Sequence, residues 1–106
     1  MYKDLLPIGS IIMLRGGVKK LMITGIKTAM KNAPEKVYDY VGVLYPEGFL
    51  GEQGNFLFNQ DDINDVIFRG YTNPEREDFL SFLDARELAN LEDESVASMN
   101  GESADQ

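Results

Sequence analysis

Residues 37–45, with the sequence VYDYVGVLY, constrain the fold of this chain more than any other stretch. Side chains alternate between the two faces of a β-strand, so Tyr40 and Leu44 lie on one face and Val43 lies on the other. Because both faces are largely apolar, we expect a central strand. Gly42 inside this strand indicates a bend, a bulge or the close approach of another backbone.

Four other apolar runs of strand length are separated by turn-forming residues. The first contains residues 11–14 and is followed by Gly16-Gly17, a pair that suits tight turns because glycine adopts positive φ at little cost. The other expected elements are strands at 19–30, 55–59 and 66–71, a loop at 31–36, a Pro-Glu-Gly turn at 46–48, and a turn or single helical turn at 60–65.

A helix is predicted after the last strand. Asn73 is a good N-cap, and Pro74 suits the first helical position because its missing N–H is not needed there. The helix is expected to end near Leu91 and to cover the sheet with an apolar stripe. The stripe consists of Phe79, Leu80, Phe82, Leu83, Leu88 and Leu91.

These elements predict an α+β fold that is mainly β. We expect a five-stranded antiparallel meander, curled into a small and partly open barrel, with one C-terminal helix. The length of 106 residues suits one domain. We place this globular domain at residues 1–91 and expect residues 92–106 to form an acidic disordered tail, because they are too polar to bury a core.

The composition argues against catalysis. The chain contains no cysteine and no histidine, which excludes disulfides, thiolate metal sites, and the commonest general base and zinc ligand. The acidic run at 59–65 fails the EF-hand pattern, since Ile63 and Val66 stand where a ligand and a glycine are required. We therefore expect no catalytic residue, no metal, no cofactor and no enzymatic activity.

The N-terminal residues do not have the pattern of a signal peptide, because Lys3 and Asp4 interrupt their short apolar pieces. The longest uncharged apolar stretches, such as residues 21–26, are too short to cross a bilayer. We therefore expect a cytoplasmic protein that does not insert into a membrane.

Positive charge gathers between residues 15 and 36, although the net charge is −8. Lysines on a sheet edge often serve only to prevent aggregation. Alternatively, basic and aromatic residues together could bind an oligonucleotide. The net negative charge opposes that use, because phosphate contacts supply most non-specific affinity. We expect no nucleic-acid partner. The basic residues are Arg15, Lys19, Lys20, Lys27, Lys31 and Lys36, opposed only by Glu35.

Several stretches carry a resemblance to a known family. They are LLPIGSIIMLRGGVKKLMITGI, YDYVGVLYPEGF, FLFNQDDINDVIFRGY and EREDFL, which together cover about residues 5–83. In this order they resemble a family of small uncharacterised-domain proteins encoded beside LXG toxin genes in the type VII secretion loci of Gram-positive bacteria. The matching residues are turns and apolar runs, so the resemblance is informative about the family and less so about mechanism.

The resemblance implies a non-enzymatic accessory protein, a chaperone or targeting factor that binds a cognate LXG effector before export. A nucleic-acid-binding barrel and an immunity or antitoxin protein remain as alternatives. For a protein partner, Tyr45 and Phe49 are expected to frame a docking face, because aromatic side chains bring large contact area at small entropic cost. An exposed edge strand could also accept a strand from the partner. The full set of candidate partner-binding residues is Tyr38, Tyr45, Phe49, Arg15, Lys19 and Lys20.

Overall fold

A computed structural model describes residues 4–30 and 32–99, and at 30 and 87–99 it describes the backbone alone. The chain divides into a sheet unit, residues 5–72, and a helical unit built on the C-terminal helix. None of the helices in the described ranges is long and apolar enough to span a membrane. The elements are β1 (Ile11–Leu14), β2 (Lys20–Met30), β3 (Ala33–Tyr45), η2 (Glu52–Gly54), β4 (Asn55–Phe58), η3 (Gln60–Asp62), β5 (Ile63–Phe68) and α1 (Pro74–Met99).

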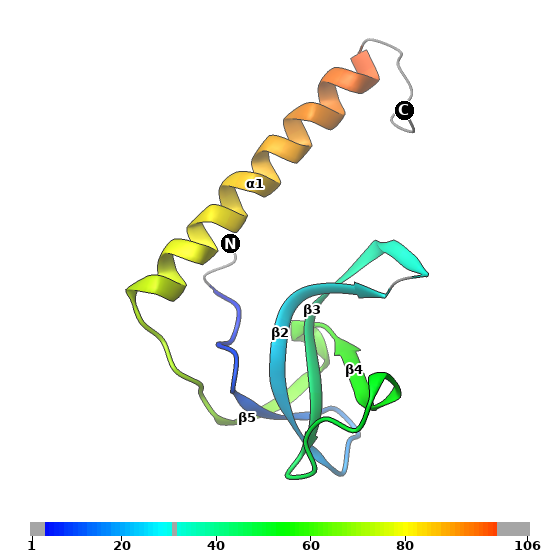
Figure 1. Ribbon diagram of the computed structural model, residues 1–106, viewed down its shortest axis with the longest axis vertical. Coiled ribbons are helices and arrows are strands. Elements are labelled where there is room, and N and C mark those ends of the chain that lie inside the picture. The colour runs from blue at the N-terminus through cyan, green and yellow to red at the C-terminus, as the bar shows by residue number, and fades with distance from the viewer. Residues whose placement is uncertain (1–3, 31, 100–106) are drawn as a thin grey trace. The chain divides into compact units, whose positions relative to one another are not determined.

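The five strands form one antiparallel sheet in the order β4-β3-β2-β1-β5. In Figure 1, β2 and β3 run side by side and curve along their length. The sheet is not closed, since β4 and β5 are its two edges. The predicted fold class is confirmed. The first four strands are paired in sequence order, and β5 returns across the sheet to pair with β1.

The register separates an inner face from an outer face, because directly paired residues of antiparallel strands point to the same side. On the inner face, Leu21 pairs with both Ile12 and Leu44, and Ile23 pairs with Gly42. The side chains that form the core of this face are fully or almost fully buried. They are Ile12, Leu21, Ile23, Tyr40 and Phe58, together with Leu5 and Leu6 from the segment before β1.

β3 is a central strand, as predicted, because β2 and β4 pair with its two sides. Tyr40 is completely buried, and its ring lies 5.5 Å from the ring of Phe58. The close approach expected at Gly42 is also present. A Cβ atom at this position would lie 2.8 Å from the carbonyl oxygen of Met22 on the neighbouring strand. Glycine is therefore the residue that lets β2 and β3 pair here.

The boundaries of β3 and β5 differ from the sequence expectations. The loop expected at 31–36 is wrong from Ala33 onward, because β3 already begins there. Met30 pairs with Ala33 and Ala29 pairs with Val37, so the register passes over residues 34–36 and Pro34 is not required as a donor. β5 begins at Ile63, earlier than expected, because Ile63 pairs with Leu14 directly after η3.

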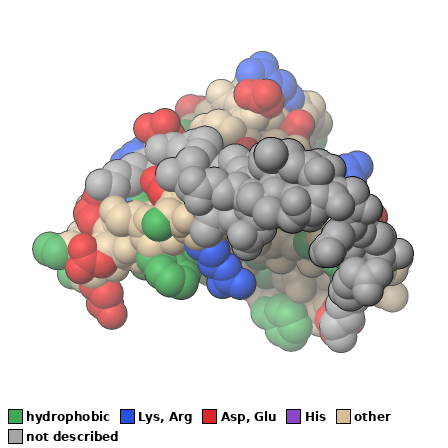
Figure 2. All heavy atoms as spheres, turned by 90° about the horizontal axis from the view of Figure 1, so that it is seen from above, with side chains coloured by type: hydrophobic (Ala, Val, Ile, Leu, Met, Phe, Trp, Pro, Cys, Tyr) green, Lys and Arg blue, Asp and Glu red, His purple; other side chains and the backbone are tan. Residues whose placement is uncertain are grey.

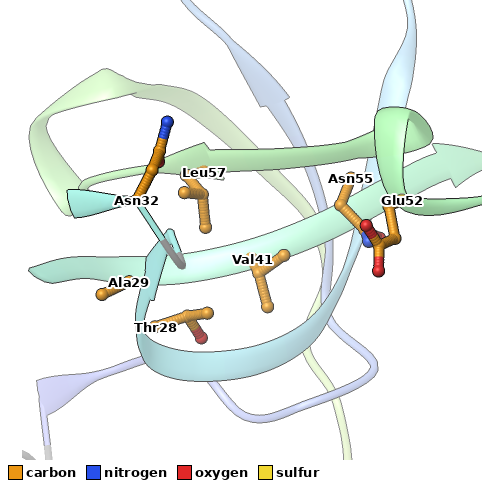
Figure 3. A pocket seen from close by; sticks show the side chains of 7 residues that line it. All are labelled: Thr28, Ala29, Asn32, Val41, Glu52, Asn55 and Leu57. Carbon is orange, nitrogen blue, oxygen red and sulfur yellow. The ribbon is translucent and has the colours of Figure 1, made fainter. Parts of the chain in front are cut away.

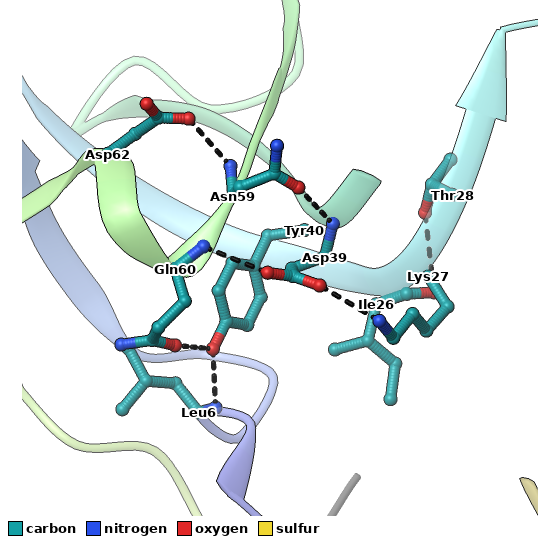
Figure 4. A network of polar contacts seen from close by, with 9 residues as sticks. All are labelled: Leu6, Ile26, Lys27, Thr28, Asp39, Tyr40, Asn59, Gln60 and Asp62. Carbon is teal, nitrogen blue, oxygen red and sulfur yellow. Dashed lines mark hydrogen bonds and ion pairs between the residues drawn. The ribbon is translucent and has the colours of Figure 1, made fainter. Parts of the chain in front are cut away.

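A polar network holds η3 against the middle of β3 (Figure 4). The Tyr40 hydroxyl donates to the side-chain oxygen of Gln60 and accepts a 2.9 Å hydrogen bond from the backbone N–H of Leu6. The Asp39 carboxylate accepts from the Lys27 ammonium at 2.8 Å and from the backbone N–H of Gln60 at 3.0 Å. The network thereby ties β2, β3, η3 and the segment before β1 together around one buried phenol.

The charge of Asp39 makes this network sensitive to acid. Partial burial raises the pKa of the Asp39 carboxyl, but the hydrogen bonds from Lys27 and Gln60 outweigh it and leave the pKa below its ordinary value of 3.8. A carboxyl whose pKa is lowered by folding contributes stability above its ordinary pKa and loses that contribution as the pH falls through the folded value.

We therefore expect Asp39→Asn to lower the urea midpoint at neutral pH and to differ less from the wild type at about pH 3. The control is Glu35→Gln, which changes an exposed carboxylate outside the network and should alter stability by under about 0.5 kcal/mol. A deficit of Asp39→Asn that is equally large at both pH values would show that the ion pair is not its cause.

Helix α1 begins as predicted. Its first residue is Pro74, and the side-chain oxygen of Asn73 accepts a 3.0 Å hydrogen bond from the backbone N–H of Arg76. The predicted end at Leu91 is wrong, since the helical backbone continues to Met99. Neither proline nor glycine occurs between these two positions to stop it. The rest of the expected tail, residues 100–106, lies outside the described residues.

The predicted apolar stripe of α1 is only partly correct. Leu80 is buried, but Phe79 is half exposed and Phe82 is 57% exposed. The expectation that these phenylalanines are covered is therefore wrong. An aromatic stripe at helical spacing indicates which face of a helix is apolar, but it does not establish that this face is buried in the free protein.

Candidate functional site

The outer face of the sheet carries a row of apolar side chains. Its register places Phe68, Ile11, Met22 and Val43 in one row across β5, β1, β2 and β3. Ile11 and Val43 are buried, whereas Phe68 is mostly exposed. Figure 2 shows one side of the molecule, on which hydrophobic side chains reach the surface in several places between charged ones. Exposed apolar side chains that lie next to one another mark candidate interaction sites.

A hollow of about 420 Å³ lies along this row, and we call it the outer groove. Its floor is apolar and consists of Ile11 from β1 and Met22 from β2. One side of the groove is formed by β5, and Tyr45 at the end of β3 forms the opposite side. Lys20 pairs with Tyr45 and adds one positive charge. The residues lining the outer groove are Gly9, Ile11, Lys20, Met22, Tyr45, Ile67 and Phe68.

A β-bulge explains how two consecutive residues of β5 line the same groove. Ile11 pairs with Phe68 and Ile12 pairs with Val66, so Ile67 has no partner on β1. In a regular strand, neighbouring side chains point to opposite faces, but a bulge changes the direction of one of them. Both Ile67 and Phe68 therefore face the outer groove, and they are 45% and 60% exposed.

A second hollow, of about 490 Å³, lies near the distal end of the β2–β3 hairpin (Figure 3). Val41 and Leu57 form an apolar pair on β3 and β4, and Glu52, Asn55, Asn32 and Thr28 surround them with polar groups. Ala29 completes the lining. This hollow has fewer apolar side chains than the outer groove and no aromatic one.

Two of the six predicted partner-binding residues, Tyr45 and Lys20, are brought together in the outer groove. Phe49 lies in the loop after β3 and is 69% exposed. Lys19 forms a 2.9 Å ion pair with Glu47 of the same loop, which attaches this loop to the start of β2. The hydrogen bond from Lys19 keeps the pKa of the Glu47 carboxyl below its ordinary value.

Tyr38 and Arg15 lie elsewhere. Tyr38 stands nearer the other end of β3, where the Lys36 ammonium lies 5.4 Å from the centre of its ring. The Arg15 side chain donates a 2.9 Å hydrogen bond to the carbonyl oxygen of Asp61, which ties the end of β1 to η3. Neither residue lines the outer groove. The six predicted residues therefore do not form one site. Two line the groove, two lie in or contact the loop after β3, and two make contacts elsewhere in the sheet unit.

Sequence reasoning missed Met22, Ile67 and Phe68 as groove residues. The signal that indicates them is the run Val66, Ile67, Phe68, in which apolar residues follow one another without the alternation of a half-buried strand. In the structure all of β5 after Ile63 is exposed. Consecutive apolar residues that are exposed on an edge strand mark a candidate interaction surface.

The lysines of the basic segment are partly neutralised. Lys27 is paired with Asp39 and Lys19 with Glu47. Among the described side chains, those of residues 4–29 and 32–86, no group of three or more is arranged to hold a metal ion. What the outer groove offers is an apolar floor, two aromatic side chains and Lys20, which makes no ion pair with any described residue.

The fold and this site define a class of small, mainly β proteins with a half-open antiparallel sheet and an apolar groove on its outer face. The chain belongs to the family described as Domain of unknown function (DUF4176), whose model matches residues 5–79. The match covers all five strands and the start of α1. Neither a curated protein nor a solved structure matches the chain.

Proposed function

We propose that this protein is a non-enzymatic accessory protein that binds a cognate LXG effector in the cytoplasm before type VII export, as a chaperone or targeting factor. The sequence resemblance supports the kind of partner. The structural support comes from the outer groove, in which Ile67, Phe68 and Tyr45 present apolar surface to solvent. Exposed aromatic and methionine side chains are enriched where one protein binds another.

The geometry gives less support to a nucleic-acid partner. Two lysines of the basic segment are in ion pairs, and Arg15 is hydrogen-bonded to a backbone carbonyl. Tyr38 and Tyr45, which would stack on bases, lie well apart along β3, and Tyr40 is completely buried. A stacking platform requires exposed aromatic rings along a basic surface, and this arrangement is not present on β3.

The proposal is tested by co-expressing the tagged protein with the LXG protein encoded beside it and by measuring the affinity of the purified pair. We expect a complex. Tyr45→Ala and Phe49→Ala are each expected to weaken it by about thirtyfold, since truncating a central aromatic side chain typically costs about 2 kcal/mol. Both variants should stay folded, because both side chains are substantially exposed.

The matched control is Tyr71→Ala, which truncates an exposed aromatic side chain outside the groove and its neighbouring loop. It should bind the effector as the wild type does. If the wild-type protein does not retain the effector, the proposed partner is wrong. If the effector binds but neither Tyr45→Ala nor Phe49→Ala weakens it, the partner is right and the surface is different.

A further inference from the structure

We propose that the outer groove binds an amphipathic α-helix of the effector, with an acidic side chain of that helix against Lys20. This inference rests on the proposed function and assigns the binding mode. It follows from three properties of the groove: its width, its floor and its charge. The width, together with the irregular edge of β5, favours a helix over an extended segment added to the sheet edge.

The width of the groove fits a helix. Its two sides are formed by Ile67 and Phe68 on β5 and by Tyr45 on β3, with β1 and β2 between them. Three inter-strand spacings separate the backbones of the two sides, which is about 14 Å. An α-helix with its side chains is about 10–12 Å across, whereas a single extended strand occupies only about 5 Å and would leave the floor uncovered.

The edge strand is a poor template for strand addition. Both Ile67 and Asn64 are skipped in the register between β5 and β1, so β5 contains two irregularities within Ile63–Phe68. Strand addition uses a regular row of backbone donors and acceptors, which bulges interrupt. The bulge at Ile67 interrupts this row of backbone groups and places the Ile67 side chain beside Phe68 in the groove. This arrangement favours a partner that binds through side chains.

The floor and the charge indicate the composition of the helix. From Gly9 to the row of Lys20 the groove follows about four residues of strand, or about 13 Å, which corresponds to about nine helical residues. Such a helix presents apolar residues at i, i+4 and i+7 to Ile11 and Met22. The flexible side chain of Met22 can adapt its shape to these residues. The ammonium of Lys20, unpaired among the described residues, complements one acidic residue.

The test uses the full chain, the full-length LXG effector, and peptides of about 20 residues that tile the effector, a length sufficient for a helix to cross the groove. Groove variant Ile67→Asp is compared with Val37→Asp. Both positions are β-branched strand residues of similar exposure, 45% and 54%, but only Ile67 lines the groove. Thermal unfolding of each variant checks that the fold is retained.

We expect Ile67→Asp to weaken effector binding by at least about thirtyfold and Val37→Asp to leave it unchanged. One tiled peptide should bind and gain helical circular dichroism on binding. Lys20→Glu should weaken that peptide by about tenfold, and changing the acidic residue of the peptide to lysine should restore the affinity.

Each other outcome overturns the proposal in a distinguishable way. If the effector binds the wild type and both aspartate variants equally, the groove is not the binding site, but the proposed function stands. If the effector does not bind the wild type, both the groove assignment and the proposed function are wrong. A bound peptide that gains no helix indicates an extended partner. A wild-type dimer in sedimentation that Ile67→Asp dissociates would assign the groove to a second copy of this chain.

Discussion

Replacing Tyr40 with alanine is expected to lower the free energy of unfolding by about 3–5 kcal/mol. The Tyr40 side chain is completely buried, and its ring packs against Phe58. Its loss leaves a cavity between β3 and β4 and removes the acceptor for the buried N–H of Leu6. Urea denaturation monitored by circular dichroism measures the change.

Two further variants separate the ring from the hydroxyl. Tyr40→Phe keeps the ring and removes the hydrogen bonds with Leu6 and Gln60, so it should cost about 1–3 kcal/mol. Tyr38→Ala truncates a partly exposed tyrosine of the same strand and should cost less than Tyr40→Ala. Equal losses for Tyr40→Ala and Tyr38→Ala would contradict the assignment of Tyr40 to the core.

Gly42→Ala is expected to destabilise the sheet by about 3 kcal/mol, at the upper end of the usual cost of overpacking. The added Cβ would lie 2.8 Å from the carbonyl oxygen of Met22 and 3.3 Å from the ring of Phe58. The first of these atoms belongs to a paired strand backbone, which cannot move without breaking its ladder. Thermal unfolding and amide hydrogen exchange across β2 and β3 measure the effect.

Gly25→Ala is the matched control for this prediction. Gly25 lies on β2, and a Cβ atom there would meet a terminal methyl group of the Val41 side chain at 2.9 Å. A partly exposed side chain can turn away, whereas a backbone carbonyl in the ladder cannot, so Gly25→Ala should cost less. A larger loss for Gly25→Ala than for Gly42→Ala would show that the backbone contact does not determine the outcome.

The elements that depend on local sequence were predictable. Gly16-Gly17 separates β1 from β2, Asn73-Pro74 begins α1, and the apolar alternation of residues 37–45 identified β3 as central. Each of these depends on the conformations open to a few neighbouring residues, or on the period of a single strand. The fold class followed from their order along the chain.

The return of β5 to β1 was not predictable in this way. It pairs Ile63 with Leu14 across almost fifty residues of chain, and nothing in either strand specifies the other. The outer groove depends on the same pairing, since Ile67 and Phe68 reach it only through the bulge opposite Ile11 and Ile12. The set predicted from sequence therefore includes two groove-lining residues, Tyr45 and Lys20, which are neighbours through the β2–β3 hairpin, and contains no residue of β5.

The extent to which the apolar face of α1 is buried could not be determined from the sequence either. The period of Phe79, Leu80, Phe82 and Leu83 identifies an apolar face correctly, yet only Leu80 is fully buried. Periodicity reports which residues share a face of a helix, and burial depends on what lies against that face. The exposed phenylalanines are therefore a property of the three-dimensional structure that no local pattern contains.

The irregular register of β5 has a consequence for how this protein tolerates high concentration. An apolar strand with a free edge is the usual nucleus of fibrils, in which identical strands stack through an unbroken ladder. The unpaired positions at Asn64 and Ile67 bend and twist β5, so that two copies cannot align edge to edge over its length. These two irregularities therefore disfavour edge-to-edge stacking of β5, although most of its side chains are exposed.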